Sequence, residues 1–134
     1  MIDIDIKAIQ RAKNRSHKLN FLKDISFKYI NANILEQKID EILIKNKLNI
    51  KYDLIIFNAA IEHFKPEEVS QIFTSCKKIM QTNGLVFGYT LVEDEDHVFD
   101  HHELLFKTKE DLKNLVKKDF NNVSCFESLS ETRH

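Results

Sequence analysis

The residues best suited to chemistry lie in two short segments, and the first is the pair Glu62-His63. This pair follows a continuous apolar run at residues 54–57. Histidine titrates near neutral pH, so His63 could act as a general base that accepts a substrate proton. The competing interpretation is a structural residue in the turn before the next helix, and the local pattern favours it.

The second segment is an acidic stretch at residues 93–103 that also contains His97, His101 and His102. Carboxylates and imidazoles can bind divalent metals. No spacing in this stretch matches a closed metal site, so a solvated loop is the favoured interpretation and no metal ligand is assigned. Cys76 falls on an apolar helical stripe and Cys125 has no evident base partner, so neither is expected to be a nucleophile.

Composition narrows the class of protein. The chain has 134 residues with 20 basic and 21 acidic side chains, a balance that gives no support for a nucleic-acid or membrane-surface partner. No apolar run approaches the roughly 20 residues of a membrane helix. Two isolated cysteines and the absence of a secretory pattern favour a reduced, cytoplasmic chain. Residues 1–134 are enough for a single domain with one core.

Strands and helices are predicted to alternate along the chain. The run at 54–57 is apolar at every position, which is typical of a strand buried on both faces of a parallel sheet. The alternation predicts an α/β fold of three layers around a mostly parallel sheet. Strands are expected at 1–4, 27–30, 54–57, 85–91 and 123–126, and helices at 5–18, 35–47, 66–80 and from 108 onward.

Three segments resemble class I S-adenosylmethionine-dependent methyltransferases. Residues 2–9 (IDIDIKAI) are similar to the second strand and helix of that family, and residues 52–64 (YDLIIFNAAIEHF) to its fourth strand and Glu-His turn. Residues 80–88 (MQTNGLVFG) resemble its fifth strand with the preceding turn. The resemblance implies a Rossmann-like fold that transfers a methyl group from S-adenosylmethionine to an oxygen or nitrogen of a small molecule.

The resemblance also implies where the adenosine part of the cofactor binds. Asp3, followed by Ile4, stands where the family places an acidic residue on the ribose hydroxyls, and a carboxylate can accept both hydrogen bonds. The competing role for Asp3 is helix capping. Asn33, followed by Ile34, corresponds to the position near the adenine amino group, with Asn31 as the alternative.

The same resemblance implies which residues line the pocket around the methionine part of the cofactor and around the substrate. Asn58 and Ala59 come directly after the fourth strand and are expected to line the methionine side of the pocket. His63 and His101 are the expected catalytic residues on the substrate side, with His102 as the alternative to His101.

The resemblance begins at the family's second strand. The first strand and its glycine-rich loop have no counterpart, and the only glycines are Gly84 and Gly88. We therefore expect an incomplete sheet and a truncated domain. A fragment of a longer methyltransferase is favoured over direct pairing of the remaining strands and over a homodimer that covers the exposed edge. The competing function is a non-catalytic interaction or regulatory domain, whereas a dehydrogenase is disfavoured because no GxGxxG is present.

Overall fold

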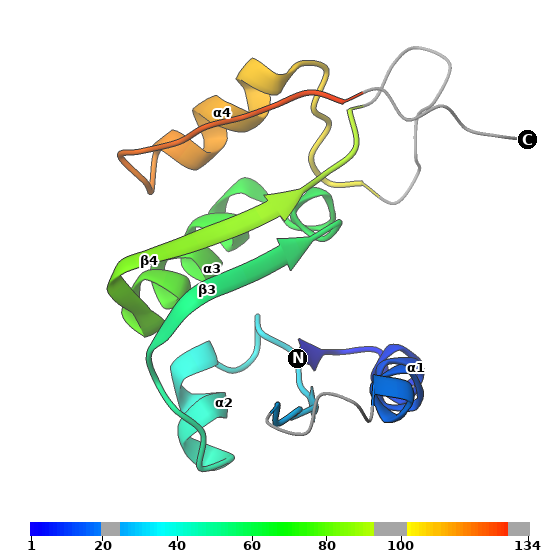
Figure 1. Cartoon of the computed structure of the whole chain (residues 1–134). Helices are drawn as coiled ribbons and strands as arrows, with labels where there is room; N and C mark the ends of the chain where they lie inside the picture. The colour runs from blue at the N-terminus through cyan, green and yellow to red at the C-terminus, as the bar shows by residue number, and fades with distance from the viewer. Residues whose placement is uncertain (20–24, 93–101, 129–134) are drawn as a thin grey trace, which may run out of the picture. The chain divides into compact units, whose positions relative to one another are not determined.

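The computed structural model describes residues 1–19, 25–92 and 102–128. The chain divides into two compact units, Met1–Asn49 and Ile50–His134. Each unit contains one pair of parallel strands with helices, as Figure 1 shows, which confirms the mixed α/β character. The single domain over 1–134 stays a prediction. None of the helices described is long and apolar enough to cross a membrane.

The first unit is built on the pair β1 (Ile2–Asp3) and β2 (Ile30–Asn31), in which Asp3 lies opposite Asn31. Helix α1 (Ile6–Ser16) follows β1 and continues into the short 3₁₀ helix η1 (His17–Leu19). The predicted cap is confirmed, because Asp5 Oδ1 accepts a hydrogen bond from the Lys7 amide at 2.7 Å.

The other helix of this unit, α2 (Ile39–Lys45), begins later than the sequence predicted. Asn33 holds the preceding residues in a turn: its Oδ1 accepts from the Leu35 amide at 3.0 Å, and its carbonyl accepts from the Gln37 amide at 3.1 Å. An asparagine that bonds to the backbone two residues ahead competes with helix formation. The strand predicted at 27–30 is likewise displaced, since β2 contains only Ile30 and Asn31.

The second unit pairs β3 (Tyr52–Asn58) with β4 (Met80–Tyr89) in parallel, with Leu54 opposite Leu85 and Phe57 opposite Gly88. Helix α3 (Pro66–Ile79) connects them after the short 3₁₀ helix η2 (Ile61–His63), and helix α4 (Lys109–Lys117) follows. The predicted capping box of α4 is confirmed: Asp111 N donates to Thr108 Oγ1 at 3.2 Å, and Thr108 N donates back to Asp111 Oδ2 at 2.9 Å.

Two strand predictions in this unit are wrong. Strand β4 begins at Met80 rather than Leu85, so the residues before Leu85 that were expected to form a turn belong to the strand. They are accommodated by a shift of register opposite Tyr52 and Leu54 of β3. Residues 123–128 form no strand. Val123 and Cys125 are half-buried and alternate with the exposed Ser124 and Phe126. The alternating sequence therefore predicted which side chains are buried, but not whether the segment pairs with another strand.

Among the described residues of the second unit, the buried cluster covers one face of the β3–β4 pair. A buried cluster of Ile61, Val69, Phe73 and Phe106 packs with Phe57, Phe64, Leu104, Leu112, Leu115, Val116 and Phe120. On the other face, Leu54 and Ile56 are 49% and 57% exposed, so the expectation of burial on both faces is wrong. The reason is that the described helices of this unit pack on the first face alone.

The second residue after α4, Asp119, joins this helix to α3. Asp119, whose side chain is only 10% exposed, accepts hydrogen bonds from Ser70 Oγ at 3.1 Å and from Lys77 Nζ at 3.0 Å. The adjacent Phe120 ring packs edge-on against Phe73, with the ring centroids 5.2 Å apart. These contacts hold the end of α4 against α3.

We expect Asp119→Ala to lower the free energy of unfolding by about 1–3 kcal/mol, because the change removes the acceptor of Ser70 and leaves Lys77 with only the Asp119 backbone carbonyl. Urea denaturation of the whole chain measures this loss. Gln71→Ala, at an exposed position of α3, is the control and should stay within about 0.5 kcal/mol of the unchanged protein. Equal losses in the two variants would contradict the role assigned to Asp119.

Gly88 gives a second stability prediction. A Cβ atom at this position would overlap the carbonyl oxygen of Phe57 on the paired strand, and backbone cannot move aside easily. We expect Gly88→Ala to cost about 1–3 kcal/mol in the same assay. Gly84→Ala should cost less, because its nearest neighbour is the movable side chain of Met80. The reverse order would show that β3 and β4 are not paired in this register.

Candidate functional site

The candidate site lies where β3 and β4 end, within the second unit. Ala59, the residue after β3, has a φ of 43°, and its amide donates to the Tyr89 carbonyl at 2.8 Å. A positive φ is uncommon outside glycine, and here it turns the chain sharply at the end of the sheet. The turn leads directly into η2, which therefore begins beside the carboxyl ends of both strands.

Glu62 is the best-anchored residue of the site. It is only 2% exposed, and its Oε2 accepts a hydrogen bond at 2.8 Å from Thr90 Oγ1, directly after β4. Its backbone carbonyl accepts from the amides of Glu103 and Leu104 at 2.8 and 3.0 Å. Through these bonds one residue holds both the end of β4 and the segment that contains His102.

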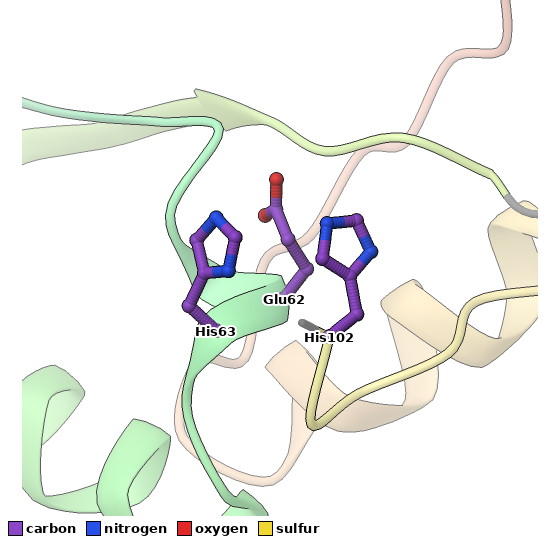
Figure 2. Close-up of side chains that lie close together, drawn as sticks. All are labelled: Glu62, His63 and His102. Atoms are coloured by element: carbon purple, nitrogen blue, oxygen red, sulfur yellow. The ribbon is translucent and has the colours of Figure 1, made fainter. Parts of the chain in front are cut away.

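His63 and His102 flank the Glu62 carboxylate, as Figure 2 shows. His63 is exposed and comes from η2, whereas His102 is half-buried and comes from the segment before Phe106. Their ring centroids lie 5.0 Å apart with an interplanar angle of 78°. One ligand atom from each of the three residues can be chosen so that all lie within 4.8 Å of one another. The arrangement can therefore transfer a proton through an imidazole or coordinate a cation.

A cavity of about 410 Å³ lies next to this cluster. Most of its lining side chains are apolar, among them Phe57, Phe73, Leu112 and Phe120. Thr90 belongs to the lining and also donates to Glu62, so the polar cluster and the apolar cavity share one residue. This size and lining are typical of a site for a small organic molecule.

The predicted adenosine-binding residues gather at the carboxyl ends of β1 and β2 in the first unit. Asp3 Oδ1 accepts from the Asp5 amide at 2.8 Å, and Asn31 Nδ2 donates to the carbonyls of Asp3 and Ile4. Asn33 accepts from Leu35 and donates to Glu36. The Ile4 side chain is exposed and Ile34 is half-buried.

The other predicted residues belong to the second unit. Asn58 and Ala59 are exposed at the end of β3, and His63 lies in η2 beside His102. His101 falls outside the residues that the structure describes. The roles of Thr90 and of the Glu103 and Leu104 amides could not be predicted, because no local spacing in the sequence links these residues to Glu62. The adjacent pair Glu62-His63 pointed to the site, as did His102, which was the alternative to His101.

Neither cysteine belongs to the cluster. Cys76 is buried in α3, and burial raises the pKa of its thiol to about 11. This agrees with the core position predicted from the apolar stripe.

The Cys76 pKa predicts how stability changes with pH. The unfolded thiol ionises near pH 9 and the folded thiol near pH 11, so the unfolded state loses the proton first and stability falls between these values. We expect Cys76→Ala to have a lower free energy of unfolding but a shallower decline from pH 9 to 11. Denaturation of both proteins at each pH measures the difference, and parallel declines would show that the thiol is accessible to water.

Comparison of the chain with models of protein families, with curated proteins and with solved structures finds no match. Function is therefore inferred from the residues and geometry of the site.

Proposed function

We propose that this chain is a methyltransferase domain of Rossmann-like architecture that uses S-adenosylmethionine to methylate an oxygen or nitrogen of a small molecule in the cytoplasm. The observation that carries the proposal is the group Glu62, His63 and His102 at the carboxyl ends of a parallel strand pair. In open α/β sheets, ligands bind outside the carboxyl ends of the strands. The apolar cavity beside Thr90 supports a small organic acceptor.

The residues at the strand ends are chemically suited to the cofactor. Asp3 uses one oxygen for the Asp5 amide, and a carboxylate retains further acceptor positions for the two hydroxyls of a ribose. Asn33 is less well suited, because its side-chain oxygen and nitrogen are both engaged in the turn before α2. The resemblance assigns Asn58 and Ala59 to the methionine part, and both are exposed where β3 ends.

When bound, S-adenosylmethionine supplies a methyl group on a positively charged sulfur, which an acceptor lone pair takes in one in-line displacement. The chain's contribution is to hold the acceptor in line and to exclude water, and orientation alone can supply several kcal/mol of the barrier. His63 is exposed and is adjacent to Glu62, which is hydrogen-bonded to the cavity residue Thr90. His63 is therefore the residue that would take the proton from the methylated oxygen or nitrogen. We assign His101 to the same substrate side.

A second candidate function rests on a different observation. The open face of β3–β4 carries Leu54, Ile56, Leu85 and Phe87, each about half exposed or more. Apolar patches on a sheet are typical of surfaces that bind another protein. The second candidate is therefore a non-catalytic interaction or regulatory domain. In that case, a second copy of the chain would bind to this apolar face.

Calorimetric titration of the full chain with S-adenosylhomocysteine tests the main proposal. We expect one binding site per chain and at least a tenfold weaker Kd for Asp3→Ala, because charge-assisted hydrogen bonds to the ribose contribute about 1.5–3 kcal/mol. Asp3→Asn keeps an acceptor for the Asp5 amide, so the local turn is preserved while the negative charge is lost. Comparison of this variant with Asp3→Ala shows whether weaker binding comes from the lost ribose contact or from a disrupted turn.

Asp53→Ala, at an exposed position in β3, is the control and should bind as the unchanged chain does. A folded chain that binds no S-adenosylhomocysteine would overturn the methyltransferase proposal. Sedimentation of such a chain as a dimer, lost in Phe87→Glu, would support the interaction domain instead.

A further inference from the structure

We propose that Glu62, His63 and His102 bind one divalent transition-metal ion of the Zn²⁺, Mn²⁺ or Co²⁺ type. The inference concerns binding alone, so it stands whether or not the chain transfers methyl groups. Its basis is the geometry of the three side chains, the burial of Glu62 and the hydrogen bonds around it.

The three ligand atoms are close enough to share one ion. They lie within 4.8 Å of one another, and two ligands each about 2.1 Å from a metal lie at most about 4.2 Å apart. Binding of one ion therefore requires the side chains to move closer together by rotation about their own bonds. Figure 2 shows the three side chains side by side, with Glu62 drawn between the two histidines.

The buried carboxylate of Glu62 favours a cation at this position. A charge removed from water is costly unless an opposite charge or several hydrogen bonds compensate for it. Thr90 donates one hydrogen bond to Glu62, but a hydroxyl carries no net charge. Within residues 1–19, 25–92 and 102–128, no lysine or arginine forms an ion pair with Glu62. A metal ion bound by the carboxylate and the imidazoles would supply positive charge at this position.

The surrounding hydrogen bonds resemble the support of a metal site. Thr90 Oγ1 donates to Glu62 Oε2 at 2.8 Å and so restrains the carboxylate. The Glu103 and Leu104 amides bind the Glu62 carbonyl, so the backbone beside His102 is fixed relative to Glu62. Such outer partners orient the ligands and commonly change metal affinity by about 10- to 100-fold.

The donor types indicate the class of ion. Two imidazoles with one carboxylate are typical of sites for zinc, iron, manganese or cobalt, whereas calcium and magnesium prefer oxygen ligands throughout. Three protein ligands leave at least one coordination position open. An oxygen of a bound molecule or a water can fill this position.

The test is titration of the metal-free full chain with Co²⁺, followed by its visible absorption, and with Zn²⁺ by calorimetry. We expect one ion per chain, and a Kd at least tenfold weaker in His63→Ala, His102→Ala and Glu62→Gln. His17→Ala removes an exposed histidine of η1 in the first unit and is the matched control, with unchanged affinity. His63 is exposed, so His63→Ala should keep its fold even if Glu62→Gln does not, and circular dichroism checks this.

Thr90 tests the positioning role separately. Thr90→Val removes the hydrogen bond to Glu62 and should weaken Co²⁺ binding about tenfold with an altered absorption spectrum, whereas Thr90→Ser should restore both. Binding that persists unchanged in His63→Ala and His102→Ala would place the ion elsewhere on the chain and overturn the inference, as would a folded chain that binds neither metal. Both readouts are independent of S-adenosylhomocysteine.

Discussion

The arrangement of the second unit depends on how the buried Glu62 is satisfied. Its carboxylate takes a hydrogen bond from Thr90, and its carbonyl takes two from the Glu103 and Leu104 amides. A buried polar group without partners costs about 1–3 kcal/mol, so these bonds must form together with the fold. They join three segments that are far apart in the sequence: the end of β4, η2 and the chain before Phe106. His102 reaches the site because backbone bonds hold its neighbours there.

The hydrophobic core and the polar site are parts of the same packing. Ile61 precedes Glu62 and lies in the buried cluster, as does Phe106, which follows the residues bonded to the Glu62 carbonyl. Burial of these apolar side chains therefore orders the two segments that carry the histidines. The sharp turn at Ala59 then sets where η2 begins, and the close approach of Gly88 to Phe57 sets the strand register that leads to the turn.

Local signals explain which elements could be predicted from the sequence. Asp5, Pro66 and the Thr108–Asp111 pair fix the starts of α1, α3 and α4 through contacts a few residues away. A strand needs a partner, and nothing local shows whether residues 123–126 have one or which face of β3 is covered. The same limit applies to the site: Glu62 and His63 were found because they are adjacent, but the link to His102 consists of backbone bonds between distant segments. The roles that the methyltransferase resemblance gives to Asp3, Asn33, Asn58, Ala59 and His101 stay predictions.

The burial of Glu62 also bears on which chemistry His63 can perform. A buried carboxylate beside two imidazoles needs positive charge, and either a protonated imidazole or a bound cation can provide it. An imidazolium has no lone pair left to accept a proton, and an imidazole bound to a metal has already used its lone pair. His63 can therefore act as a general base only while its ring nitrogen is neither protonated nor bound to a metal. If the proposed cation binds, both histidines would be its ligands rather than bases, and the cation would supply the chemistry of a Lewis acid beside the cavity.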